Sequence, residues 1–323
     1  MRYIIIGSGA VGGTIGARLH QSGQDVLLVA RGAHYAELRD NGLRFLTPDS
    51  DDRLDIPVAD GPVPAGEGDV LVVATKSQDT VAALAPWPAD LPVVCAQNGV
   101  DNERMVLRRF EAVYGMCVWL PAQHLEPGVV AAYGHPHSGL LQLGRYPQGV
   151  DELSEQVAGD LAKSGFVARA VADAMRWKYG KLIGNLGNAV EALCGHADGM
   201  AALVERARTE AYGVLDGAGI AYATPAEEAE VRGDRVTVRP IDGIRRGGGS
   251  SWQSLARGSG SIEADYLNGE IVLIGREHGI PVPVNEVLQR EANAAARERR
   301  EPGSMPVERL AALIDERCAA GSR

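Results

Sequence analysis

Short, continuous hydrophobic runs recur through the first half of the chain, with helical patterns between them. The first run, Tyr-Ile-Ile-Ile at residues 3–6, ends at a glycine, and a helical spacing of apolar residues follows. Runs that are apolar at every position are typical of parallel strands with both faces buried. We therefore predict a parallel sheet covered by helices. The other predicted strands lie at residues 24–31, 69–75, 91–96, 114–120 and 139–143, with a short one at Val58 after an acidic loop at residues 49–52.

Glycines follow the first hydrophobic run at a regular spacing, between the predicted strand and the predicted helix. A helix N-terminus directs free N–H groups and the positive end of its dipole at one point, where a pyrophosphate can bind. Gly7 would make the turn, Gly9 would let the backbone approach the phosphates, and Gly12 would let the helix pack on its strand. The alternative is a purely structural turn, because 40 of the 323 residues are glycine. The predicted dinucleotide-binding residues are Gly7, Ser8, Gly9, Ala10, Val11 and Gly12.

The second predicted strand ends in a cation. Domains that bind NAD place an acidic residue about 20 residues beyond the glycines, where it binds the ribose 2′-hydroxyl. In this chain Arg31 stands at that place. A guanidinium suits a 2′-phosphate, which a carboxylate would repel. We therefore predict NADP(H) as the cofactor, with a solvated arginine at a strand end as the alternative.

The pattern changes in the second half, which is mostly helical and rich in alanine. A length of 323 residues exceeds one typical domain. The predicted fold class is α/β, with a Rossmann-type doubly wound parallel sheet in residues 1–170 and a second, all-helical C-terminal domain in residues 171–323. Residues 224–249 are polar and include Arg245 and Arg246, and we predict that this segment is mobile.

Polar residues follow two more of the predicted strands. Lys76 comes directly after residues 69–75, and Asn98 follows residues 91–96 after one glutamine. Ligands of open parallel sheets bind at the carboxyl ends of the strands, so we predict that Lys76 and Asn98 belong to the same site as Arg31. Each residue taken alone is equally compatible with a solvated strand end or a plain turn.

Residues 177–189 carry an amine and two amides among apolar positions. If this segment is one helix, Lys181, Asn185 and Asn188 share one face, because they are spaced i, i+4 and i+7. Such a face could bind a polar substrate, whereas an exposed polar stripe is the alternative. Lys178 is a rival for Lys181, but Lys181 fits the spacing to Asn185.

Two further polar clusters lie downstream. Ser250 and Ser251 could hydrogen-bond a carboxylate, and Glu263 could pair with a lysine or bind a substrate hydroxyl. Asp265 is the rival carboxylate. By composition alone, both clusters are typical of residues at the start of a helix, which is the alternative interpretation.

Charge and cysteine content argue against several classes of protein. The net charge of −10 argues against binding to nucleic acid or to an anionic membrane surface. No apolar run is long enough to span a membrane, and glycine interrupts the first run too early for a signal peptide. The 4 cysteines form no CxxC pair, which indicates reduced thiols and a cytoplasmic location. His135 and His137 lack a third ligand of suitable spacing, so no metal site is predicted.

Together, these segments resemble the ketopantoate reductase (2-dehydropantoate 2-reductase) family over nearly the whole chain. The resemblance implies an N-terminal Rossmann domain, a helical C-terminal domain and NADPH-dependent reduction of a 2-oxo acid in pantothenate biosynthesis. The segments that carry it are residues 7–12, Lys76, residues 97–99, Lys181 with Asn185, Ser250 with Ser251, residues 263–269 and residues 276–285.

The resemblance also implies roles for individual residues. Lys181 is implied as the catalytic lysine, and Glu263 as the active-site carboxylate next to the cofactor. Lys76 and Asn98 are implied at the junction of cofactor and substrate. The implied substrate-binding residues are Lys181, Asn185 and Ser251, to which we add Asn188.

The chain departs from the family pattern at several positions near the implied substrate. The family's second asparagine is replaced by Ala189, although Asn188, one residue earlier, could substitute for it. The asparagine that often stands three residues before the second serine is replaced by Gly248. Residues 250–254 lack the usual aspartate, and residues 119–124 lack the usual threonine and histidine pattern.

The predicted function is therefore NADPH-dependent reduction of a small-molecule 2-oxo acid to a 2-hydroxy acid, with ketopantoate as the first candidate. The departures leave open a reductase of a different 2-oxo or ketone substrate. A non-catalytic NADP-binding sensor is a third class, against which Lys181 and Glu263 argue. A homodimer formed through the helical domain is a hypothesis.

Overall fold

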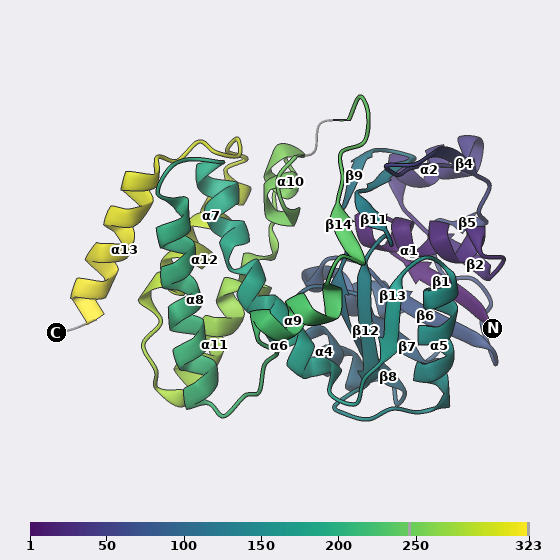
Figure 1. The fold of residues 1–323 in the computed structure, drawn as a ribbon, viewed down its shortest axis with the longest axis horizontal. Helices are drawn as coiled ribbons and strands as arrows, with labels where there is room; N and C mark the ends of the chain where they lie inside the picture. The colour runs from purple at the N-terminus through teal and green to yellow at the C-terminus, as the bar shows by residue number, and fades with distance from the viewer. Residues whose placement is uncertain (245–246, 322–323) are drawn as a thin grey trace. The chain divides into compact units, whose positions relative to one another are not determined.

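The structure, a computed structural model, describes residues 1–244 and 247–321, which form two compact units (Figure 1). The first unit contains residues 1–178 and returns for residues 223–244, whereas the remaining described residues form the second. This division differs from the predicted one at residue 170. Residues 223–244 belong to the first unit because β14 (Val236–Val238) pairs with β11 (Gly134–Pro136) of that unit.

The polar segment predicted to be mobile contains regular structure. Helix α9 (Pro225–Arg232) begins at Thr224, whose side chain and that of Glu227 form a capping box. Strand β14 follows it, so residues 171–323 are not all helical. Arg245 and Arg246 lie outside the described residues.

A mostly parallel sheet lies at the centre of the first unit, as predicted. In the described chain its strand order is β13-β12-β8-β7-β6-β1-β2-β5. All neighbours from β8 to β5 pair in parallel. The strands are β1 (Arg2–Ile6), β2 (Asp25–Val29), β5 (Val58–Ala59), β6 (Asp69–Val73), β7 (Val93–Cys95), β8 (Val113–Trp119), β12 (Leu140–Arg145) and β13 (Val167–Ala170).

One pairing in this sheet departs from the prediction. Strand β12 runs antiparallel to β8 and parallel to β13, so the sheet is mixed. A parallel return beside β8 would need a crossover connection, usually a helix. The described chain between β8 and β12 holds only the short strands β9 (Ala122–Glu126), β10 (Val129–Ala132) and β11, and it provides no such helix.

Helices cover both faces of the sheet (Figure 1). In β1, Tyr3 and Ile5 pack with residues of α1 and α5 in one core, whereas Ile4 and Ile6 pack with residues of α3 and α4 in another. This alternation follows from the two-residue period of a strand. The described helices of this unit are α1 (Ala10–Gln21), α2 (Gly32–Asn41), η1 (Ser77–Asp79), α3 (Thr80–Leu84), α4 (Asn102–Leu107), α5 (Glu152–Lys163), the start of α6 (Ala174–Asn185) and α9.

A second sheet, of order β4-β3-β10-β9, was not predicted. Strand β4 (Asp51–Leu54) begins within the predicted acidic loop, so the prediction of a loop is wrong for Asp51 and Asp52. The cross-strand partner of Asp51 is Leu46 of β3 (Leu43–Leu46), and its carboxylate accepts a hydrogen bond of 2.7 Å from Arg44. Cross-strand pairing thus stabilises a segment whose own composition favours a loop.

The described part of the second unit is helical, as predicted for the C-terminal half. In α8, Leu203, Ala207, Ala211 and Val214 are buried along one stripe, which is the pattern of an amphipathic helix. None of the described helices combines the length and hydrophobicity that a bilayer crossing requires. Besides the end of α6, the helices are α7 (Gly187–Cys194), α8 (Met200–Gly217), α10 (Ser250–Ala256), η2 (Glu263–Tyr266), α11 (Asn268–His278), α12 (Pro283–Arg297) and α13 (Val307–Gly321).

Candidate functional site

The glycine segment forms the turn between β1 and α1. Gly7 has φ +93°, a conformation that L side chains rarely adopt. A Cβ on Gly12 would lie 2.1 Å from the Gly7 carbonyl oxygen, so α1 packs on its strand only because this residue is glycine. A Cβ on Gly9, the N-cap of α1, would meet no atom within 4 Å. The start of α1 therefore borders open space, and its first turn has no acidic side chain to compete with an anion.

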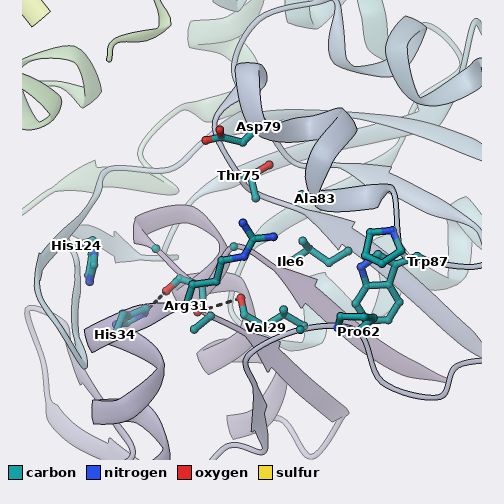
Figure 2. A pocket seen from close by; sticks show the side chains of 16 residues that line it. Ile6, Val29, Arg31, His34, Pro62, Thr75, Asp79, Ala83, Trp87 and His124 are labelled. Atoms are coloured by element: carbon teal, nitrogen blue, oxygen red, sulfur yellow. Dashed lines mark hydrogen bonds between the residues drawn. The ribbon is translucent and has the colours of Figure 1, made fainter. Parts of the chain in front are cut away.

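This open space belongs to a pocket of about 370 Å³ in the first unit (Figure 2). Its walls come from the carboxyl ends of β1, β2 and β6, which is where ligands of such sheets bind. Of the predicted cofactor residues it brings together Gly7, Ser8, Gly9 and Arg31.

Arg31 occupies the predicted place after β2 and is the N-cap of α2. Its side chain is exposed to solvent and extends across the pocket (Figure 2). A guanidinium in this position presents a planar set of N–H donors beside the glycine turn, which suits a phosphate group.

Two histidines, which the sequence analysis missed, also line this pocket. The backbone N–H of Gly128 donates to Nδ1 of His34 over 2.9 Å, so the other ring nitrogen, Nε2, carries the proton and donates to the Ser8 carbonyl oxygen over 2.8 Å. Burial lowers the pKa of His34. The ring of His124 lies against it, with 4.4 Å between centroids. The only sequence signal was the position of His34, three residues after Arg31.

The other predicted cofactor residues, Ala10, Val11, Gly12, Lys76, Asn98 and Glu263, do not line this pocket. Two of them follow neighbouring strands of the sheet. Lys76 is the N-cap of η1 after β6, and Asn98 follows β7. A chain of buried polar groups fixes the backbone there. Gln97 donates to Thr80 (2.8 Å), Thr80 to the Asn102 side chain (3.1 Å), and Asn102 to the carbonyl of Asn98 (2.9 Å). The sequence analysis did not predict this chain of hydrogen bonds, which holds the ends of β6 and β7 together.

The helix predicted to carry the catalytic amine is divided. Lys181 and Asn185 lie on α6 at i and i+4, whereas Asn188 lies on α7 after a turn at Leu186, so the condition of one continuous helix is not met for Asn188. The buried side chain of Asn268 donates to the Leu186 carbonyl oxygen over 3.3 Å. This bond satisfies a carbonyl at the helix break, where intrahelical partners run out.

A buried polar network extends from this break. The Asn268 side chain also donates to the Asn285 side chain over 2.9 Å, and Asn285 donates to the Glu210 carboxylate over 2.7 Å. Burial raises the pKa of Glu210. Because Asn268 begins α11 directly after η2, which carries Glu263, the network joins the η2 segment to α7, α8 and α12. The network contains Asn268 and Asn285, which are the asparagines of residues 263–269 and 276–285, two of the segments on which the family resemblance rests.

The two rival residues have other partners. Lys178 is buried and forms an ion pair with the buried carboxylate of Glu103. Burial raises the pKa of Glu103. Asp265 is exposed and accepts hydrogen bonds from Gln289 (2.7 Å) and Asn293 (2.6 Å) of α12. Both side chains therefore connect elements of the fold.

Gly248 and Trp252, two residues near the serines at which the chain departs from the family pattern, are in contact with each other. Ser251 is buried on α10, and the Gly249 N–H before it donates to the Glu191 carboxylate over 2.9 Å. A Cβ on Gly248 would lie 2.6 Å from the Trp252 ring. Trp252 therefore fills the space that a side chain at position 248 would need.

The two histidines of the His-Pro-His segment have separate contacts. His135 lies 3.5 Å from the Asp49 carboxylate, and His137 is 3.0 Å from the Arg235 carbonyl oxygen. In the described part of the chain, no three His, Cys, Asp or Glu residues are grouped so that they could hold a metal ion.

Comparison with known proteins identifies the family. Models of ketopantoate reductase PanE/ApbA and of its C-terminal part match residues 3–148 and 173–296. A 2-dehydropantoate 2-reductase of Archaeoglobus fulgidus is 30% identical over 290 residues, which cover 89% of this chain and 95% of the relative. The chain belongs to the ketopantoate reductase family. It is therefore an oxidoreductase acting on a CH–OH group, with a nicotinamide cofactor and a small-molecule substrate.

Other relatives agree over the full length. A 2-dehydropantoate 2-reductase of Halobacterium salinarum is 29% identical, over 92% of this chain and 100% of the relative. The crystal structure of a PanE/ApbA family ketopantoate reductase from Ralstonia eutropha covers 93% of this chain and 100% of its own, with TM-score 0.77 and 26% identity. D-mandelate dehydrogenase with NADH and anilino(oxo)acetate has the same fold, with TM-score 0.79, 23% identity and coverage of 93% and 100%.

Proposed function

We propose that this protein uses NADPH to reduce a 2-oxo acid to a 2-hydroxy acid, with 2-dehydropantoate as the first candidate substrate. The observation that carries the proposal is the pocket in which Arg31 lies beside the glycine turn. The relatives named 2-dehydropantoate 2-reductase support the choice of substrate.

The residues of the pocket fit the phosphate-bearing part of NADP(H). The open space at Gly9 leaves room for a pyrophosphate, and the N–H groups at the start of α1 can donate to it. The Arg31 guanidinium matches the charge and shape of a 2′-phosphate. When bound, the reduced nicotinamide supplies the hydride.

In the proposed mechanism, Lys181 acts as the general acid. Its ammonium donates a hydrogen bond to the 2-oxo oxygen and gives up a proton as negative charge develops there. Glu263 is proposed as the active-site carboxylate, with Lys76 and Asn98 next to the cofactor. The residues proposed to hold the substrate are Asn185, Asn188 and Ser251.

A different 2-oxo acid or ketone is the second candidate substrate. Ala189 and Gly248 replace amides of the family pattern, and the Trp252 ring fills the space beside Gly248. These replacements remove hydrogen-bonding groups and add apolar surface, which favours a less polar substrate side chain.

The direct test is to measure NADPH consumption by the purified protein against a panel of 2-oxo acids that includes 2-dehydropantoate. Turnover of 2-dehydropantoate above all others supports the first candidate. Activity confined to other members of the panel supports the second. A protein that binds NADPH and oxidises it with no member would contradict the proposal and favour a sensor. We also propose a cytoplasmic location, which is supported by four cysteines that form no disulfide. Light scattering tests the proposed homodimer.

A further inference from the structure

His34 joins three segments that are far apart in the sequence. It lies in the first turn of α2, receives the Gly128 N–H from the β9–β10 turn, and donates to the carbonyl of Ser8 in the glycine segment. The β9–β10 turn packs closely on α2, because a Cβ on Gly128 would lie 2.3 Å from the Glu37 side chain. The imidazole therefore connects the glycine segment to the second sheet.

The bond to Ser8 fixes the orientation of one peptide group. In a trans peptide the C=O and the following N–H point in opposite directions, so a Ser8 carbonyl held by His34 makes the Gly9 N–H point away from His34. Glycines on both sides of Ser8 would otherwise let this peptide rotate at little cost. A reversed peptide would turn a carbonyl oxygen toward the side on which an N–H is needed for a phosphate.

We propose that His34 is a positioning residue of the dinucleotide site, which in its neutral, Nε2-protonated form holds the Ser8–Gly9 peptide in the orientation that the pyrophosphate needs. The inference rests on the proposed function, because it assumes that this pocket binds a nicotinamide nucleotide. It assigns His34 no contact with the reacting atoms.

The neutral form is required for a geometric reason. A protonated ring would carry a hydrogen on Nδ1, which would face the Gly128 N–H instead of accepting from it. Burial lowers the pKa of His34 below its ordinary value near 6.5, so the ring is neutral at pH 7. The other titratable and charged side chains that line the pocket with His34 are Arg31, Asp79 and His124, and Glu37 of α2 lies beside Gly128. The glycine segment and the β9–β10 turn contribute backbone groups.

Two conservative variants separate the two hydrogen bonds. In His34→Gln the amide nitrogen takes the place of Nε2 and keeps the donor to Ser8, whereas in His34→Asn the amide oxygen takes the place of Nδ1 and keeps only the acceptor for Gly128. We expect His34→Asn to weaken binding of both NADPH and NADH about tenfold, in line with the loss of one hydrogen bond. His34→Gln should stay within about threefold of the unchanged protein. Circular dichroism verifies that both variants are folded.

The pH dependence of nucleotide affinity provides a second readout. The dissociation constant of the unchanged protein should rise as the pH falls through the lowered pKa of His34, whereas that of His34→Gln should not. NADH is used beside NADPH, because a 2′-phosphate titrates near pH 6 itself. The control His124→Phe keeps a ring against His34 but removes the second imidazole, and it should retain the acid sensitivity.

Nitrogen NMR of the His34 ring, recorded on the protein alone, tests the tautomer independently of any ligand. A proton on Nδ1 at pH 7 would overturn the inference, as would unchanged affinity in His34→Asn or an equal acid response in His34→Gln. If the unchanged protein binds neither nucleotide, the proposed function fails and this inference fails with it. Binding by the unchanged protein that the Asn variant does not weaken defeats the inference alone.

Discussion

In the proposed function, the choice between the two nicotinamide nucleotides depends on the side chain of Arg31. It extends across the pocket next to the glycine turn, and its guanidinium would meet a 2′-phosphate only in NADPH. Charge-assisted hydrogen bonds contribute about 1.5–3 kcal/mol each, which corresponds to a factor of roughly 10–100 in affinity.

We therefore expect Arg31→Ala to raise the KM for NADPH by about 10–100-fold and to leave the KM for NADH nearly unchanged. Steady-state kinetics with each nucleotide measure the two values. Arg31→Lys is the matched control, which keeps the charge but loses the planar fork, so its KM for NADPH should be intermediate. An equal change for both nucleotides would show that Arg31 does not contact the 2′-phosphate.

Lys181 is the residue whose loss should affect chemistry and leave cofactor binding intact. It shares a face of α6 with Asn185, while the rival Lys178 is buried against Glu103. A positioned general acid contributes about 10²–10⁴-fold to a rate, so Lys181→Ala should lower kcat by that factor. Fluorescence titration should give an unchanged dissociation constant for NADPH. Loss of NADPH binding in parallel with kcat would contradict the assignment.

At the scale of elements, the β1–turn–α1 unit uses its glycines for different purposes. Gly12 is needed because the helix packs against the turn, whereas the space beside Gly9 is open. The sequence pattern predicted this unit correctly, because a strand, a turn and a helix that are adjacent in the chain are governed by local backbone geometry.

Two alanine variants test this difference. Gly12→Ala places a Cβ 2.1 Å from the Gly7 carbonyl oxygen and should destabilise the protein by at least about 1–3 kcal/mol. Gly9→Ala meets no atom within 4 Å, so it should keep its unfolding temperature but bind NADPH at least about tenfold more weakly. Thermal unfolding and nucleotide titration of both variants measure the two effects. A stable Gly12 variant, or a Gly9 variant with full affinity, would be inconsistent with these roles.

At the scale of the whole molecule, the buried pair of Lys178 and Glu103 joins α6 to α4 within the first unit. Removing one member of a buried pair leaves the other charge uncompensated and costs about 3–5 kcal/mol. Lys178→Met should therefore lower the free energy of unfolding by about that amount, as measured by urea denaturation. The double variant Lys178→Met with Glu103→Leu should recover most of the loss.

The pH dependence of this variant has a definite sign. Burial already raises the pKa of Glu103, and loss of the lysine should raise it further. A carboxyl whose folded pKa is raised binds more protons in the folded state, so stability falls as the pH rises through that pKa. The loss of stability in Lys178→Met should thus become smaller as the pH is lowered through the raised pKa of Glu103 toward the ordinary carboxyl range. A deficit that grows on acidification would mean that Glu103 is not the charge left behind.

By itself, the amino-acid sequence determined the features that depend on neighbours in the chain. The sequence pattern predicted the strands of the central sheet other than β13, the glycine turn, the place of Arg31 after β2 and the helical character of the second half. Burial periodicity and backbone freedom are local properties, so a linear pattern contains them.

Tertiary structure alone decided which distant residues meet. His34 and Gly128 are separated by 94 positions, and Glu103 and Lys178 by 75, so no spacing rule could pair them. The second sheet, the antiparallel course of β12 and the break between α6 and α7 have the same origin, because each depends on partners from elsewhere in the chain. Long-range hydrogen bonds and ion pairs form only when folding brings those partners together, and here they add to local propensity or override it.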